Sequence, residues 1–156
     1  MARFRFPLSR LLRVRELGEE LARNELLAAE ARVQEAERRL AAARDEVRAG
    51  LAHIARLQSS PELEAELVLA AQRSVPALER RVRTRDEERS GLRIAADAAR
   101  ETWQAARVDK RALERLEERA MGVFRESERA LEDKALQEQV DRKAALAGPL
   151  RRKDEV

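Results

Sequence analysis

The sequence contains no cysteine and no tyrosine, and it has only one tryptophan and three phenylalanines. Without cysteine, disulfides and thiolate metal sites are excluded, which fits a reducing compartment. With so few large rings, a thick layered core is not expected. The five glycines stand singly, so the chain lacks the glycine-rich loops that hold nucleotide phosphates.

Residues that build other kinds of site are also scarce. His53 is the single histidine, and because a metal site needs several converging ligands, we expect it to be a solvated surface residue. Acidic pairs such as Glu87-Glu88 lack a pocket that would desolvate them. No apolar run approaches the roughly 20 residues that cross a bilayer, and the start does not resemble a signal peptide. We therefore predict a cytoplasmic chain without enzymatic activity, cofactor, metal or integral membrane segment.

The residues that are abundant are those of long helices. Hydrophobic residues make up 44% and charged residues 40%, dominated by alanine, leucine, glutamate and arginine, as in coiled coils. The 33 basic and 30 acidic residues are interleaved and leave a net charge of only +3, so most charges are expected on solvated, ion-paired helix surfaces. A length of 156 residues suits a single domain.

Apolar residues recur at alternating spacings of three and four in two stretches. This heptad pattern keeps one narrow stripe of a helix facing a partner helix. Two such stretches around a polar break predict an all-α fold, an elongated antiparallel two-helix coiled coil with a short helical connector. The predicted seam residues are Leu26, Val33, Leu40, Val47 and Ile54 in the first stretch and Leu78, Val82, Leu92, Trp103 and Leu113 in the second.

Prolines predict where these helices begin and end. Pro7 suits a first helical position, and Ser60 followed by Pro61 resembles a second helix start. Pro76 pushes Val75 out of helical geometry, so another boundary is predicted there. The predicted order is an arm over about 8–58, a connector over about 59–75, a second arm over about 76–146 and a polar tail over 147–156. A turn at Pro76, with only a kink at Pro61, is the alternative.

The first arm opens with another apolar pattern. Leu11, Val14, Leu17 and Leu21 form an early stripe, which then shifts phase to Leu26. A shift of this kind is a stutter, and it predicts local unwinding of the supercoil.

Trp103 has two interpretations. It is a core anchor opposite small residues, with Ala28, Ala29 and Ala31 near it if the connector is 59–75, or an exposed residue that binds a partner. The core interpretation is favoured.

Three polar residues, Arg85, Arg89 and Lys110, also occupy seam positions. Their aliphatic stems cover apolar surface while their charged heads reach water. They are expected to weaken the seam and to indicate a splayed region or a third partner.

Positive charge gathers at the start of the chain, where the first fifteen residues hold five arginines and no acid. An antiparallel hairpin brings this cluster near the basic residues at the far end. The stretch lacks the interleaved stacking aromatics of a single-strand nucleic-acid binder. A solvated positive cap is the commonest outcome for such a cluster, and an anionic lipid surface or an acidic protein surface are the alternatives. The candidate partner-binding residues are Arg5, Arg10, Arg13, Arg15, Arg151 and Arg152.

Nearly the whole chain resembles the flagellar FliJ family, the soluble stalk protein of the flagellar type III export apparatus. The resemblance lies in Phe4-x-Phe6-x-Leu8-x-x-Leu11-Leu12, in Ala36-Glu37-x-x-Leu40, and in Trp103-x-x-Ala106-x-x-Asp109-Lys110-x-x-Leu113-Glu114-x-Leu116-x-Glu118-Arg119.

The resemblance implies a non-enzymatic stalk, similar to the central stalk of rotary ATPases, that enters a hexameric export ATPase with its terminal end. It implies contact with the cytoplasmic domain of the export gate protein at the inner membrane, and with empty export chaperones. In some members, aromatic residues near the middle of the rod contact the gate, and the corresponding stretch here, Ala41 to Gly50, has none.

Two alternatives stay open at this stage. The stalk protein of the injectisome type III secretion system is similar in shape and role. A generic coiled-coil scaffold protein has the same heptads without these partners.

Overall fold

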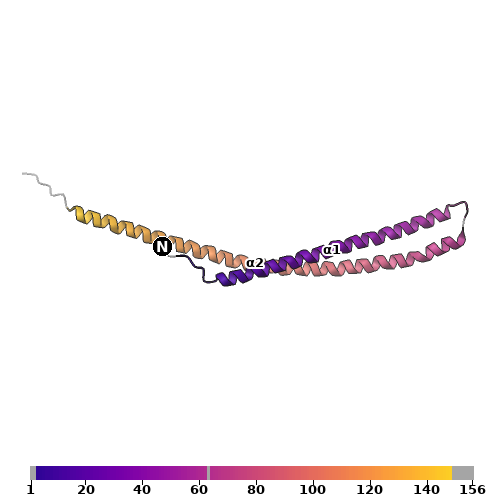
Figure 1. Cartoon of the computed structure of the whole chain (residues 1–156), viewed down its shortest axis with the longest axis horizontal. Helices are drawn as coiled ribbons and strands as arrows, with labels where there is room; N and C mark the ends of the chain where they lie inside the picture. The colour runs from indigo at the N-terminus through magenta and orange to yellow at the C-terminus, as the bar shows by residue number, and fades with distance from the viewer. Residues whose placement is uncertain (1–2, 63, 149–156) are drawn as a thin grey trace, which may run out of the picture. The chain divides into compact units, whose positions relative to one another are not determined.

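A computed structural model describes residues 3–62 and 64–148, and these fold into two long helices. Helix α1 spans Ser9–Gln58 and helix α2 spans Ala65–Ala147, as Figure 1 shows. No strand occurs within the described ranges. The predicted all-α class, with two long helices packed together, is therefore confirmed.

Helix α1 begins two residues later than Pro7. Pro7 and Leu8 form a turn in which Ser9 N donates to Phe6 O at 3.2 Å, and Leu12 N donates to Leu8 O at 2.9 Å. At the other end, Ser59 Oγ donates to the carbonyls of Ala55 and Arg56 at 3.0 and 3.1 Å. The serine hydroxyl thus satisfies carbonyl oxygens that a helix end leaves without partners.

The predicted connector over 59–75 is wrong, because α2 begins at Ala65 and continues through Pro76. Glu64 O accepts the first bonds of α2, from Leu67 N at 3.1 Å and Val68 N at 3.2 Å, so neither Ser60 nor Pro61 begins the helix. An internal proline costs a helix about 3 kcal/mol.

The cause of this continuity is the apolar stripe across the proline. Val68, Ala71, Val75 and Leu78 keep the alternating spacing and are all half-buried. Packing of this stripe offsets the local cost of Pro76, and the turn of the hairpin shortens to residues 59–64.

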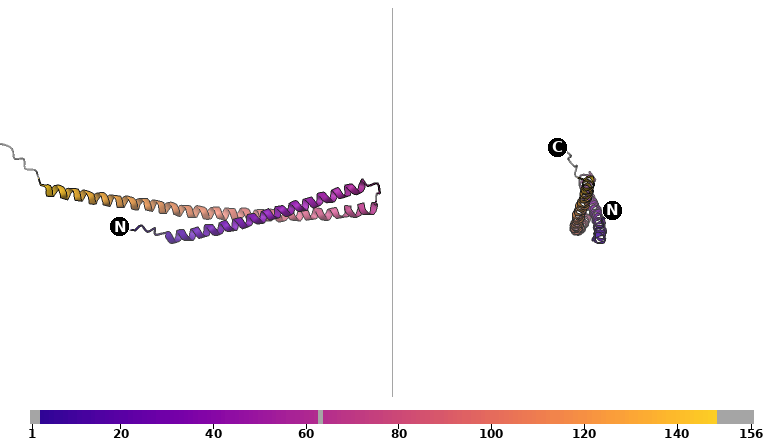
Figure 2. Two further views of the ribbon diagram at one scale, coloured as in Figure 1. Left: turned by 45° about the horizontal axis from the view of Figure 1, so that its top comes forward. Right: turned by 90° about the vertical axis from the view of Figure 1, so that its left-hand side faces the viewer.

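The chain divides into two compact units, one of residues 15–109 and one that combines residues 1–14 with 110–156. The 15–109 unit is an antiparallel helical hairpin, visible in Figure 2 where the ends of α1 and α2 lie side by side around the turn. Residue numbers rise along α1 as they fall along α2 in the ion pairs Arg15–Asp109, Glu30–Arg100, Glu37–Arg93 and Glu46–Arg81.

The seam of the 15–109 unit is best buried on α1. Its larger buried residues are Leu26, Val33, Leu40 and Ile54, while Val47 is half-buried. Between them runs a column of small residues at every seventh position, namely Ala22, Ala29, Ala36, Ala43 and Gly50. On α2, Leu78, Val82, Leu92 and Trp103 are half-buried and Ala96 is buried.

The predicted early stripe is wrong. Leu11, Val14, Leu17 and Leu21 are all exposed, between 43% and 65%. Within the 15–109 unit, Glu16 and Glu19 are half-buried and Ala22 is buried instead. The longer stripe from Leu26 onward sets the face of α1 that packs, and a continuous helix carries that face backward through Ala22 and turns the leucines outward.

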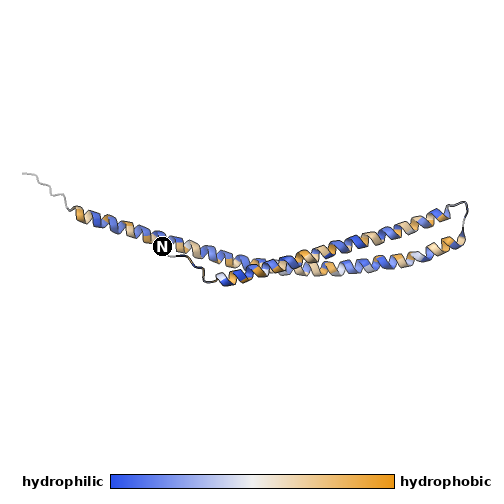
Figure 3. Ribbon diagram, viewed as in Figure 1, coloured by the Kyte–Doolittle hydropathy of each residue, from blue (hydrophilic) through white to orange (hydrophobic). Residues whose placement is uncertain are grey.

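The second unit is described over 3–14 and 110–148. Phe6, Leu12 and Leu113 are its buried residues. From residue 129 to 148 every residue of α2 and its end is exposed, and Figure 3 shows hydrophilic and hydrophobic residues alternating along this stretch. Gly148 ends the helix with φ of +62°, a conformation that favours glycine.

Candidate functional site

Three of the predicted partner-binding arginines lie at the start of the chain. Arg5 lies on the non-helical segment before α1, while Arg10 and Arg13 lie on the first turns of α1, and all three are exposed. Arg15 belongs to the other unit, where Nη1 is 3.1 Å from Asp109 Oδ2. Arg151 and Arg152 lie outside the described residues.

The segment before α1 is held by its two phenylalanines, which the sequence analysis did not single out as anchors. Phe6 is 8% exposed, and the ring of Phe4 lies 5.5 Å from that of Phe124 between centroids, tilted by 52°. Arg3 and Arg5 alternate with them and stay exposed. This period of two is typical of an extended chain, and it is the signal that could have revealed the anchors.

Beside this segment lies a groove of about 590 Å³. Its lining comes from Arg3, Phe4, Arg5, Phe6, Pro7 and Ser9, with Glu117 from α2. Two guanidinium groups and no acidic residue in the first turn of α1 leave this surface positive. It is suited to acidic side chains of a partner.

Trp103 is half-buried, between the buried anchor and the exposed residue that the two interpretations predict. Its ring is half-buried, its Nε1 donates to Glu19 Oε1 at 2.8 Å, and the guanidinium carbon of Arg107 lies 5.4 Å from its centroid. The expected neighbours around Ala29 are wrong, because the turn at 59–64 moves the level of Trp103 along α1 to Glu19. The indole is thus anchored between a carboxylate and a cation.

The polar seam positions of α2 pair within their own helix. Arg85 Nη1 donates to Glu88 Oε2 at 2.7 Å, and Arg89 Nη2 lies 3.0 Å from Asp86 Oδ1. Arg89 Nε is buried without a hydrogen bond, and the buried Asp86 Oδ1 is in ion-pair contact with Arg89 Nη2.

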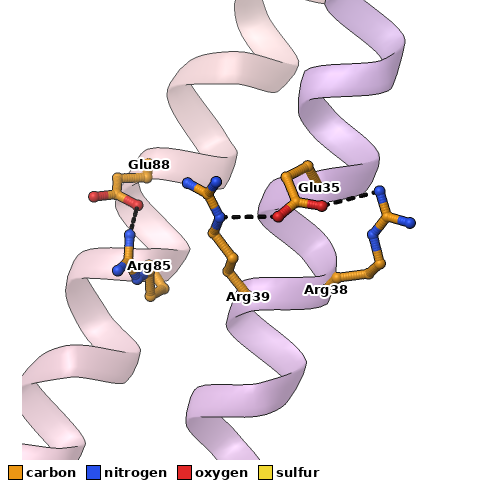
Figure 4. Close-up of polar contacts among 5 residues, drawn as sticks. All are labelled: Glu35, Arg38, Arg39, Arg85 and Glu88. Atoms are coloured by element: carbon orange, nitrogen blue, oxygen red, sulfur yellow. Dashed lines mark hydrogen bonds and ion pairs between the residues drawn. The ribbon is translucent and has the colours of Figure 1, made fainter.

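Opposite this stretch, α1 also pairs within itself, as Figure 4 shows. Glu35 accepts from Arg39 at 3.1 Å and lies 2.9 Å from Arg38. In the described chain, the ion pairs of these seam residues therefore lie within one helix and do not cross to the opposite helix.

An apolar groove of about 580 Å³ opens between the helices toward the turn. Val47 and Val82 form its floor, and its rim is made by Arg44, Arg48, Glu79 and Arg83. Arg48 pairs with Asp45, while no ion pair is recorded for Arg44 or Arg83 within the described residues. The groove overlaps the stretch 41–50 through Arg44, Val47 and Arg48.

The ion pairs between the helices are exposed. In the Glu30–Arg100 pair, the hydrogen bond and negative charge of Glu30 raise the pKa of Arg100 above its ordinary value. Because exposed pairs contribute about 0–1 kcal/mol each, they favour the antiparallel register more than they stabilise the fold.

Other kinds of site find no support in the described ranges. No group of three or more potential metal ligands occurs among these residues. His53 is exposed, beside a groove of about 380 Å³ lined also by Leu57 and Leu67. Within residues 3–62 and 64–148, neither helix has a stretch that is long and apolar enough to span a membrane.

Comparison with known proteins gives one match. No curated protein and no solved structure is significantly similar to this sequence. The family model described as flagellar FliJ protein matches residues 4–148, nearly the whole chain. With its two packed helices, this chain therefore belongs to the flagellar FliJ protein family of the flagellar export apparatus.

Proposed function

We propose that this chain is the non-enzymatic stalk of the flagellar type III export apparatus. In this role it inserts into the hexameric export ATPase, links it to the cytoplasmic domain of the export gate protein, and escorts empty export chaperones. It works in the cytoplasm, at the cytoplasmic face of the inner membrane, as an antiparallel coiled coil. The family match over residues 4–148 carries the proposal.

The positive start of the chain supports the contact with the ATPase. Arg5 and Arg10 are exposed, and Arg3 and Arg5 line a groove with a single acidic residue, Glu117. Acidic residues in the pore of the hexamer are the complementary surface. Attraction between such surfaces speeds encounter and orients the stalk, and it weakens as salt rises.

The groove floored by Val47 and Val82 supports the contact with the gate. Relatives that use aromatic residues in the middle of the stalk offer broad rings, whereas this chain offers an apolar floor with Arg44 and Arg83 at its rim. The gate segment that suits it carries aliphatic anchors flanked by acidic residues.

Co-purification with the hexameric export ATPase tests the proposal. Reversal of Arg5, Arg10, Arg13 and Arg15 to glutamate is expected to leave helicity nearly intact, to abolish binding and stimulation of the ATPase, and to impair motility. The matched control reverses Arg23, Arg56, Arg73 and Arg111, exposed residues with no ion pair recorded in the described chain. Unchanged affinity of the first variant in low salt would show that the arginines are not the contact.

Binding experiments with the same purified protein distinguish two other roles. A stalk of the injectisome would bind an injectisome ATPase in preference to the flagellar one. A scaffold protein would self-associate through exposed leucines such as Leu17 and Leu21 and bind neither ATPase.

A further inference from the structure

Residues 3–8, here called the strap, are a non-helical segment at 3–6 followed by a turn at Pro7 and Leu8, and they lie against α2. Phe6 is buried and Phe4 half-buried, while Arg3 and Arg5 face solvent. Phe4 contacts Phe124, and Glu117 lies beside the strap across their shared groove. Two backbone hydrogen bonds join the strap to the start of α1, from Ser9 N to Phe6 O at 3.2 Å and from Leu12 N to Leu8 O at 2.9 Å.

The strap covers α2 beyond the point where α1 begins. After the buried Leu113, half-buried residues continue along α2 as Glu117, Ala120 and Phe124. The four residues 3–6 reach about 13 Å when extended, and Glu117 to Phe124 spans about 10 Å of helix. In the described part of this unit, the strap has the length needed to cover that stretch.

The covered face has the pattern of a helix-binding surface. Leu113, Ala120 and Phe124 continue the alternating spacing that α2 uses along its whole packed length. Leu116 and Val123 lie next to this stripe and remain 45% and 67% exposed. Together they form an apolar band about 100° wide, which is typical of a helix that packs against another helix.

The strap fills this face poorly. It places two aromatic side chains on the stripe and leaves Leu116 and Val123 in water, whereas a helix would contact all of them at once. We propose that residues 3–8 are a displaceable strap, and that the face of α2 beneath it, centred on Phe124 and Val123, binds an amphipathic helix of a partner protein once the strap leaves.

The occupant follows from the continuity of this face with the interface between α1 and α2. A helix with leucines at the first and fourth heptad positions reproduces the chemistry that α1 presents to α2. The inference goes beyond the proposed function, because it holds whether or not the chain binds an export ATPase.

The proposal is tested by comparing the same protein with the strap crosslinked to α2 and with the strap free. Because the chain has no cysteine, Arg5→Cys with Glu117→Cys provides two unique thiols on either side of the groove. One portion is bridged with a short bismaleimide, and the matched control portion is capped with N-ethylmaleimide. The probe is a fluorescent synthetic helix with leucine at the first and fourth heptad positions, and binding is measured by anisotropy.

The capped protein is expected to bind the helix at least about tenfold more tightly than the bridged protein, since only molecules with an open strap are competent. Phe4→Ala with Phe6→Ala should bind more tightly still, and adding Val123→Glu should remove that binding with unchanged circular dichroism. Equal affinity of bridged and capped protein would overturn the strap. No binding to the double-alanine variant, or dimers of it in sedimentation velocity, would overturn the face or its occupant.

Discussion

The two sides of the seam in the 15–109 unit are buried to very different extents. On α1, Leu26 and Leu40 are 7% and 3% exposed, whereas Leu78 and Leu92 on α2 are only half-buried. The burial of each helix depends on the size of the seam side chains on the other helix. The column of alanines and a glycine on α1 presents small side chains, which cover little of α2. Equal heptads therefore do not imply equal burial.

The largest effect is expected when one seam leucine of each helix is shortened to alanine. Leu40→Ala is expected to lower the free energy of unfolding by about 3 kcal/mol, because it empties a well-buried position. Leu92→Ala should cost about half as much, since part of that side chain is already in water. Urea unfolding followed by circular dichroism measures both. Equal losses would contradict the asymmetry between the helices.

Trp103 is the largest side chain on the α2 side of the seam, and two substitutions separate its packing from its hydrogen bond. Trp103→Ala should cost about 3 kcal/mol through lost packing. Trp103→Phe keeps a ring but removes the Nε1–H that Glu19 accepts, so about 1 kcal/mol is expected. Thermal unfolding checks both values. An unchanged midpoint together with lost partner binding would identify an interaction residue without a structural role.

The polar stretch of α2 can be replaced by apolar residues. Asp86→Leu with Arg89→Leu is expected to raise stability by about 1 kcal/mol, because the ion pair is partly desolvated and Arg89 Nε lacks a hydrogen bond. Asp86→Asn with Arg89→Gln is the polar control. A loss of stability in the leucine variant would show that these charges have partners in solution.

The smallest effect concerns the small-residue column of α1. A Cβ at Gly50 would lie 3.2 Å from Leu78 Cδ1, while nothing lies within 4 Å of one at Gly91. Gly91→Ala should therefore stabilise by about 1 kcal/mol from helix propensity, and Gly50→Ala by about 0.5 kcal/mol less. Equal gains in thermal unfolding would mean that the helices are not close at Gly50.

The sequence was most informative where one periodic pattern had no competitor. The run from Leu26 to Ile54 predicts a packed helix, and that helix is present. The start of α1 carries two apolar faces. Which of them packs against α2 depends on the position of the longer seam that begins at Leu26. The leucines at 11, 17 and 21 therefore pointed to the wrong one.

The remaining errors arose where a local rule met a distant contact. Pro76 predicts a helix boundary by its own chemistry, and only packing of the stripe on both sides of it overrides that rule. Phe4 and Phe6 precede the helix, and their anchoring depends on Phe124, which no local pattern connects to them. The candidate arginines could be chosen from charge alone. The groove beside them could not be predicted, because it joins residues 3–9 to Glu117.

The end of α2 has a thermodynamic consequence. Residues 129–147 are helical although every one of them is exposed, so side-chain burial within the described chain does not hold them. Their helicity rests on a stretch free of glycine and proline, on side-chain contacts such as Gln137 to Asp141, and on growth from the packed turns before it, which avoids a new nucleation step. A protein that binds this end binds a helix that is already formed, so little further loss of backbone conformational entropy opposes the binding.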